Sequence, residues 1–274
     1  MQGNGIDVIL NSNNLNGKLK WNTTAIYNYI SNKTTKYFDE SAQTINTLLS
    51  GGRSITPVIG KPLYAIAAFQ WAGLNGEGNP QGYLNGALST DYAAMLASSS
   101  GKDGDQPSIV YVGSSMPTST GSLINTFSYA NFELAVNIAY KLGYYFRKPA
   151  ISYSGIVAGS MGNKEYADRW QHPGDESRTT VPAFNYPADG TRDMFYAYST
   201  INALKGDHIR LQYINLTYTP VQPLGISAMK QIQLYINVAN LGILWRANDH
   251  NLDPDFPNGL PTPKTFSAGI RASF

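Results

Sequence analysis

The sequence of 274 residues contains no cysteine. A disulfide scaffold, a zinc site with thiolate ligands and a cysteine nucleophile are therefore excluded. Charged residues are also scarce, at 14% with a formal net charge of +2, against roughly 25% in ordinary soluble domains. No lysine or arginine run is present, so the sequence offers no argument for nucleic-acid binding.

Long apolar runs are missing as well. No stretch reaches the roughly 18 consecutive apolar residues that a transmembrane helix needs. The opening MQGNGIDVIL has neither a basic region nor a long apolar core, so we expect no signal peptide in this chain. If the protein lies in a membrane it must cross as β-strands, and the chain would then be a fragment of something longer.

Catalytic and metal-binding motifs are not found either. The three histidines are far apart at His172, His208 and His250, without an HExxH motif or a G-x-S-x-G elbow. The carboxylate pairs are Asp103/Asp105, Asp175/Glu176 and Asp253/Asp255. They lack the later glutamate of a calcium-binding loop, and we interpret them as solvated turns. We predict no enzyme activity, no cofactor and no metal site.

What the sequence does contain is long two-residue alternation. In FELAVNIAYKLGYYF, residues 132–146, every second side chain from Phe132 to Phe146 is apolar or aromatic. The other face carries Glu133, Asn137 and Lys141. Such a period predicts a β-strand, far longer than the usual 5–6 residues or so. Tilted by about 45°, a strand of this length would rise roughly 33 Å and cross a bilayer, with aromatic rings at both headgroup zones.

The same alternation recurs elsewhere, and we expect roughly nine strands in total. Strands are predicted over 18–29, 60–73, 123–129, 132–146, 206–219, 230–240 and 265–274. Within 206–219 the apolar face changes parity between Leu211 and Ile214, which predicts a bulge or a change of environment.

The connections between these strands alternate in length. Residues 129–131 form a very tight turn, whereas three connections are long, rich in Gly, Pro, Asn and Ser, and without a clear helical pattern. They are residues 74–106, 147–205 and 241–263. Short turns at one end of a sheet and long loops at the other are typical of outer-membrane β-barrels.

Several stretches in a fixed order resemble one family. They are NGID at 4–7, GKPLYAIAAFQWAGL at 60–74, NTFSYANFELAVNIAYKLGYYFRKP at 125–149, YADRWQHPGDE at 166–176, GDHIRLQYINLTYTP at 206–220 and NLDPDFPNGLPTPKTFSAGIRASF at 251–274. The chain resembles the C-terminal part of a SusC/RagA-family TonB-dependent outer-membrane transporter of Bacteroidetes type. It departs from the family pattern at Asn251, where glycine is usual, and at Asp255, where glutamate is common.

The resemblance implies an all-β fold, an antiparallel transmembrane β-barrel of 22 strands. Residues 1–274 would supply the C-terminal part, with the plug domain, the TonB box and the signal peptide absent and the three long connections external. The last strand would carry the barrel-insertion signal, with Gly269 and Phe274 as its members.

The resemblance also implies a function, the import of an oligomeric nutrient, a glycan or peptide, across a Gram-negative outer membrane. The implied partners are a SusD-like surface lipoprotein, the TonB complex, the barrel-assembly machinery and outer-membrane lipid. Lumen-facing candidates are Glu133, Asn137, Lys141, Gln231, Gln233, Asn237 and Arg271. Candidates for ligand or partner contact in the external loops are Trp170, His172, Arg178, Arg192 and Trp245, beside Phe184 and Tyr186.

Two other functions stay open at this point. A soluble carbohydrate-binding or adhesion β domain would expose aromatic platforms without entering a membrane. A glycan-cleaving enzyme would need two carboxylates about 5–9.5 Å apart, which sequence spacing alone does not reveal. The external-loop side chains could equally pack their loops without binding anything.

Overall fold

The computed structural model describes residues 1–38, 44–97, 108–160, 162–221 and 230–273. It divides into two compact units. The sheet unit contains residues 4–30, 117–143 and 206–274, and the mixed unit contains residues 1–3, 31–116 and 144–205.

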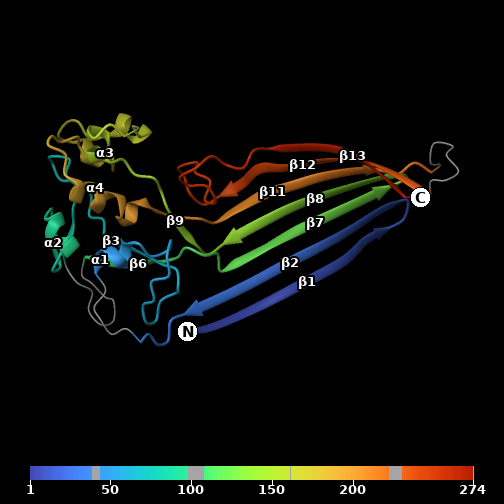
Figure 1. Cartoon of the computed structure of the whole chain (residues 1–274), viewed down its shortest axis with the longest axis horizontal. Helices are drawn as coiled ribbons and strands as arrows, with labels where there is room; N and C mark the ends of the chain where they lie inside the picture. Colours follow the sequence, from blue (N-terminus) through green and yellow to red (C-terminus); the bar gives the residue numbers. More distant parts are fainter. Residues whose placement is uncertain (39–43, 98–107, 161, 222–229, 274) are drawn as a thin grey trace. The chain divides into compact units, whose positions relative to one another are not determined.

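The sheet unit is built on a seven-stranded sheet in which spatial neighbours follow one another along the chain (Figure 1). From β2 to β13 every neighbouring pair is antiparallel. The strands, in order, are β1 (Gln2–Asn16), β2 (Leu19–Lys33), β7 (Ser119–Tyr129), β8 (Phe132–Leu142), β11 (His208–Tyr218), β12 (Gln231–Arg246) and β13 (Thr265–Ser273). The predicted mainly β, antiparallel fold is confirmed.

The sheet has one apolar and one polar face because side chains alternate along each strand. A row on the apolar face runs through Trp21, Phe127, Leu134, Leu216 and Ile236, which are direct partners across five strands. The adjacent row on the polar face is Asn22, Thr126, Ala135, Asn215 and Asn237. Toward the C-terminal edge the apolar face is strongly exposed, with Phe266 at 73% and Ile270 at 71%.

Strand β8 is shorter than the sequence predicted. It ends at Leu142, because Gly143 takes a φ of +76° and the chain turns away. The short strand β9 (Tyr145–Arg147) pairs with β10 (Ala203–Lys205) in the mixed unit instead. Tyr144 and Phe146 are buried there, at 5% and 7% exposure, so the predicted aromatic girdle at this end of the strand is wrong.

Ten steps of β8 span about 33 Å, or about 23 Å when tilted by about 45°, close to the roughly 25 Å apolar band of outer-membrane barrels.

The bend at Gly143 gives a stability prediction. We expect Gly143→Ala to lower the free energy of unfolding by about 1–3 kcal/mol, because φ is positive and the new Cβ would lie 2.1 Å from the Oγ1 of Thr118. Urea unfolding followed by tryptophan fluorescence measures the change. Gly17→Ala is the matched control, since Gly17 has open space around it. An equal midpoint for the two variants would contradict the prediction.

Two local features of the sheet are as predicted. The pairing of β11 shifts register between Leu211 and Tyr213 against both of its neighbours. Against β8, Gln212 is the extra residue of a bulge, so the apolar side chains keep one face. Against β12, the extra residue lies on β12. Tyr129 pairs directly with Phe132, which leaves a two-residue turn with Ala130 at a φ of +51°. Strand β1 was not predicted, since its polar residues hide the alternation.

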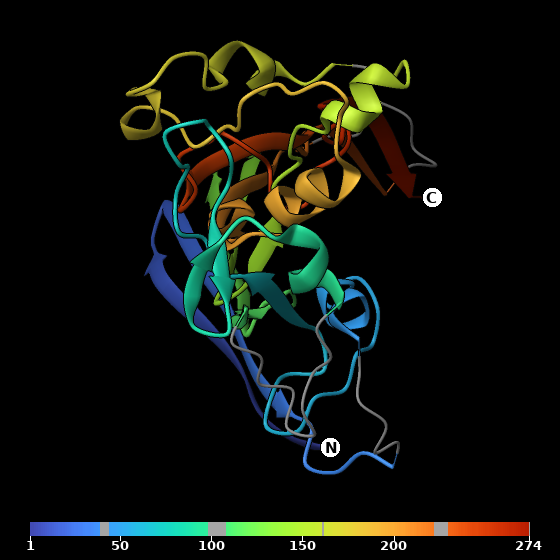
Figure 2. The same cartoon turned by 90° about the vertical axis from the view of Figure 1, so that its left-hand side faces the viewer.

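The mixed unit contains helices that the sequence analysis missed. The connections expected to be non-helical hold α2 (Tyr92–Ala97), α3 (Tyr153–Val157) and α4 (Gly190–Ala197). Helix α1 (Ile45–Leu49) precedes them, in the segment after β2. Figure 2 shows α1, α2 and α4, in blue, green and orange, gathered together. The unit also holds the 3-10 turns Lys164–Asp168, Asp175–Ser177 and Thr200–Asn202. The described helices include none that is long and apolar enough to span a membrane.

Residues 60–73 are not a strand of the large sheet. They supply only β3 (Ala65–Phe69), which pairs with β6 (Ile109–Ser114) in a separate two-stranded sheet. All five residues of β3 are buried, which explains why this segment shows no clean alternation. A third small sheet pairs β4 (Gly82–Leu84) with β5 (Ala87–Ser89).

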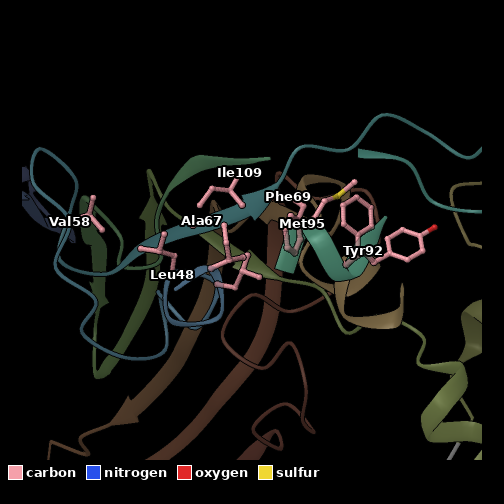
Figure 3. Packing of buried hydrophobic residues seen from close by; sticks show 10 residues of the cluster. Leu48, Val58, Ala67, Phe69, Tyr92, Met95 and Ile109 are labelled. Atoms are coloured by element: carbon pink, nitrogen blue, oxygen red, sulfur yellow. The ribbon is translucent and has the colours of Figure 1, made fainter. Parts of the chain in front are cut away.

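The core of the mixed unit forms around β3. Phe195 lies 5.0 Å from Phe69 and 5.3 Å from Tyr92 between ring centroids, and Met95 is fully buried beside them (Figure 3). Arg147 enters the same region and donates hydrogen bonds to the carbonyls of Leu49 and Ala67. Burial lowers the pKa of Arg147 to about 10, so the guanidinium is still charged at neutral pH.

Candidate functional site

All seven lumen-facing candidates lie on the polar face of the sheet. Register places Glu133 beside Thr217, Asn137 beside Tyr213 and Lys141 beside His208. Gln231, Gln233 and Asn237 alternate with apolar residues of β12, and Arg271 pairs with Gln233. The polar face is therefore a continuous hydrophilic surface. That it lines a lumen stays a prediction.

Basic side chains gather at one end of this face. Thr120, Lys141, His208 and Arg246 form one row of direct partners, and Arg210 lies two residues along β11 from His208. His208 is almost completely buried, and its Nδ1 lies 2.9 Å from the carbonyl of Gly206. His208 is the first residue of β11, within the segment 206–219 that the sequence predicted to be a strand.

The connection between β12 and β13 places two carboxylates against the basic side chains Lys141, His208 and Arg210. We call residues 253–262 the strap. The Nζ of Lys141 lies 2.8 Å from Asp255 Oδ1, and the Nε2 of His208 lies 3.5 Å from Asp255 Oδ2. The Nη2 of Arg210 lies 2.7 Å from Asp253 Oδ1 and 3.4 Å from Asp255 Oδ2. The interpretation of this carboxylate pair as a solvated turn is wrong.

The electrostatics of Asp255 follow from these contacts. Burial of the carboxyl disfavours its charged form, but hydrogen bonds from His208 and Lys141 and the charge of Lys141 outweigh burial. They hold the pKa of Asp255 well below its usual range. The carboxylate is therefore ionised throughout the physiological range, and its contribution to folding stability is lost only in strong acid.

A cavity of about 510 Å³ lies between the strap and the sheet. The strap contributes Asp255, Phe256 and Thr262 to its lining, and the sheet contributes Lys141, His208, Arg210 and Gln212 among others. Gln212 is the bulge residue of β11. Its volume lies within the range of small-molecule sites, so the cavity can hold a polar or anionic ligand such as the end of a short oligomer.

A second hollow, of about 360 Å³, lies farther along the polar face toward the turn end. It is lined by Asn215, Thr217, Gln233, Tyr235, Asn237, Ser267 and Arg271, three of which are lumen-facing candidates. Gly269 pairs with Tyr235, and a Cβ at Gly269 would lie 2.4 Å from the tyrosine hydroxyl oxygen. Glycine at this position therefore makes room for a ring. Phe274, the other insertion-signal residue, lies outside the described residues.

Three external-loop candidates lie in one segment of the mixed unit. The indole nitrogen of Trp170 donates to Glu176 Oε2 at 2.9 Å, and the ring packs against Gly78. The side chain of His172 is 83% exposed and Arg178 is also exposed. Glu176 and Asp175 accept backbone amides of the same loop. Trp170 therefore holds the loop together, whereas His172 and Arg178 remain available for contact.

Arg192 has a structural role. It is 2% exposed, and its Nε and Nη1 donate to the side-chain oxygens of Asn79 and Asn185. Its Nη2 donates to the carbonyls of Gly78 and Ala183 at 3.1 and 2.9 Å. The expectation that Arg192 is a surface ligand or partner contact is wrong, because its guanidinium holds two loops together.

Trp245 is misplaced in the prediction as well. It belongs to β12, pairs with Ile209 and lies on the apolar face of the sheet, not in a loop. Phe184 and Tyr186 lie where predicted and are 42% and 77% exposed. Phe184 contacts Tyr153 with ring centroids 5.4 Å apart.

Sequence reasoning missed the cluster on the basic row. His208-Ile209-Arg210-Leu211 alternates polar and apolar residues at the start of a strand, and this signal could have placed both basic side chains on one face. The approach of Asp253 and Asp255 had no such signal, because a loop of this length has no periodicity.

With this geometry in view, the chain is an antiparallel β protein whose main sheet has an apolar and a hydrophilic face. No protein-family model matches it, and no curated protein does either. Its fold is similar to solved structures of the RagAB peptide transporter, with a TM-score of 0.71 and 20% identity, over 99% of this chain and 29% of that chain. Structures of the RagAB peptide importer in the open-open and closed-closed states give TM-scores of 0.71 and 0.70, again at 20% identity and 99% of this chain.

These comparisons establish a fold relationship to RagAB transporter chains. At 20% identity they show the fold alone. The chain spans less than a third of the length of the chains it matches.

Proposed function

We propose that this chain is the C-terminal barrel segment of a TonB-dependent importer in the outer membrane, which takes up an oligomeric nutrient such as a peptide or a glycan. The observation that carries this proposal is the two-faced sheet. Its apolar side chains are exposed across neighbouring strands, and its opposite face is hydrophilic and hollowed. The similarity of fold to chains of a peptide importer supports the same function.

In this function the two faces have different tasks. The apolar face would contact lipid, where Leu134, Ile138 and Ile236 lose water contact favourably. The polar face would belong to a hydrated passage of a closed barrel, since an open strand edge is not tolerated within lipid. The seven strands of the main sheet cannot enclose the lumen of a 22-stranded transporter, so the remaining strands and a plug would come from the rest of the protein.

The proposed partners follow from the same function. A SusD-like lipoprotein would cover the external loops, and the exposed His172, Arg178 and Tyr186 are the side chains offered to it. The TonB complex would act through a part of the protein outside this chain. The chain would break no bond, and the described residues contain no cluster suited to a metal ion.

Cell fractionation of a strain that expresses the full-length protein tests this function. We expect the protein in the outer membrane fraction, with a gel mobility that changes on heating, as folded barrels show. Extraction by carbonate into the soluble fraction, with unchanged mobility, would favour a soluble adhesion domain instead. A glycan-cleaving enzyme would be indicated by hydrolysis of oligosaccharides by the purified full-length protein.

A photoreactive lipid probe gives a residue-level test. We expect the probe to react with Leu134, Val136 and Ile138 on the apolar face and not with Asn137 and Lys141 on the polar face. The reverse pattern would contradict the proposed orientation of the sheet.

A further inference from the structure

The cavity beneath the strap has the features of an ion-pair site that is already occupied. Lys141 and His208 converge on one carboxylate, Asp255, and Arg210 contacts both carboxylates of the strap. Each basic group belongs to a strand of the sheet, whereas both acidic groups belong to the connecting segment 247–264. The strap therefore contacts this end of the sheet through charge pairs that a competitor can replace.

The strap does not satisfy every donor of this site. Lys141 and Arg210 carry two positive charges against the two carboxylates of Asp253 and Asp255. Among the described residues, the Nε of Arg210 is buried without a hydrogen-bond partner. An unsatisfied buried donor is costly, so the site has capacity for an additional acceptor.

The accessibility of the basic groups allows a ligand to reach them. The side chain of Lys141 is 43% exposed and lines the cavity. The side chain of Asp255, the acidic partner of Lys141 in this ion pair, is 23% exposed. The cavity volume of about 510 Å³ accommodates a short oligomer end beside them.

We propose that this cavity is a binding site for a ligand carboxylate, and that Asp255 occupies the site until a ligand carboxylate displaces it and releases the strap. The inference deepens the proposed function, since it assigns an acidic group to the imported oligomer. A tethered carboxylate competes at a high effective concentration, so the unmodified protein binds a ligand carboxylate weakly and exchanges it readily. Lys141 and Arg210 are the binding residues, and Asp255 is the internal competitor.

The test measures carboxylate binding with and without the competitor. The full-length protein in detergent is titrated calorimetrically with trialanine, with trialanine amide and with a galacturonate disaccharide. We expect Asp255→Asn to bind a carboxylate probe roughly tenfold or more tightly than the unmodified protein, the scale of one charge-assisted hydrogen bond. We expect Asp255→Asn to bind trialanine amide no more tightly than the unmodified protein does, because the amide has no carboxylate. The two acidic probes separate a peptide terminus from an acidic sugar as the source of the carboxylate.

The controls separate the site from general charge effects. Asp249→Asn removes a carboxylate from the same connection, where the side chain is 92% exposed, and we expect it to leave probe binding unchanged. Adding Lys141→Gln to Asp255→Asn is expected to abolish the gain. If Asp255→Asn does not tighten binding of either acidic probe, or if the amide gains equally, the inference is overturned.

Strap release gives a second readout that does not depend on the choice of probe. A cysteine introduced by Pro254→Cys lies between the two carboxylates of the strap at a buried position, and we expect maleimide to modify it several-fold faster in the Asp255→Asn background. Equal rates in the two backgrounds would contradict displacement of the strap. Fractionation is independent of both readouts, so an outer-membrane protein without carboxylate binding would refute this inference and leave the proposed function standing.

Discussion

Replacing Arg192 by leucine is expected to lower the free energy of unfolding of the mixed unit by about 3–5 kcal/mol, the range seen when one partner of a buried charged contact is removed. Three acceptors would lose the donor that Arg192 supplies, namely the side-chain oxygens of Asn79 and Asn185 and the carbonyl of Ala183. The carbonyl of Gly78 would lose one of its two donors, because it also accepts from the amide of Ala183. These unpaired acceptors account for the expected loss, at about 1–3 kcal/mol for each one that stays buried.

The measurement for this prediction is local as well as global. Thermal unfolding by circular dichroism reports the overall loss. Hydrogen exchange at the amide of Ala183, which donates to the carbonyl of Gly78 at 2.9 Å, reports whether the two loops separate. Emission of Trp170 reports the same event, because its ring packs against Gly78.

Two further variants show whether geometry or charge holds the loops. Arg192→Lys keeps the charge but replaces a planar fork of donors by a single ammonium group, so we expect it to recover less than half of the loss. Arg178→Ala, an exposed arginine of the same unit, is the control and is expected to change stability by at most about 0.5 kcal/mol. If Arg192→Leu behaves like Arg178→Ala, the structural role assigned to Arg192 is wrong.

The sheet was predictable because each of its strands repeats the same local rule. Alternation along β8 and β12 assigned residues to faces correctly, and a change of parity in β11 revealed a bulge. These signals survive in sequence because one face of a strand is chemically unlike the other.

The mixed unit was not predictable in the same way. Its strand β3 is buried on both faces and shows no alternation, and its helices are only five to eight residues long, too short for a helical period to stand out. Arg192 could be mistaken for a surface residue because only tertiary structure brings Gly78 and Ala183 to its guanidinium. The same limit applied to Asp255, whose partners lie on strands distant in sequence.

The ends of strands were the least accurate part of the sequence analysis. Tyr144 and Phe146 continue the alternation of β8 perfectly, yet both belong to another unit, and Phe146 belongs to another sheet. Gly143 is the residue that separates them, and a glycine inside an alternating run is a known sign of a bend. Asn251 is a related case, since it adopts a φ of +57° at a position where the resemblance led us to expect glycine.

The apolar face carries the second large prediction, which concerns Ile138 near the middle of β8. Ile138 pairs with Leu123 and Leu211 on that face. If the face contacts the lipid interior, Ile138→Arg is expected to cost about 2–4 kcal/mol, the penalty for arginine at the midplane of a transmembrane barrel. The assay is the amount of heat-modifiable, folded protein in the outer membrane, together with urea unfolding in lipid vesicles.

The matched variant is Ala135→Arg in the same strand. Ala135 lies on the polar face between Thr126 and Asn215, where an arginine remains hydrated, so we expect a loss below about 1 kcal/mol. Tyr129→Arg, at the turn end of β7 on the apolar face, is expected to fall near the low end of the same depth scale, at about 0–1 kcal/mol. A loss of stability that is largest for arginine at Ile138 and small at Ala135 and Tyr129 requires a surface whose polarity depends on both face and depth. A soluble domain has no depth gradient, so equal effects at Ile138 and Tyr129 would remove the physical basis for a membrane-spanning sheet.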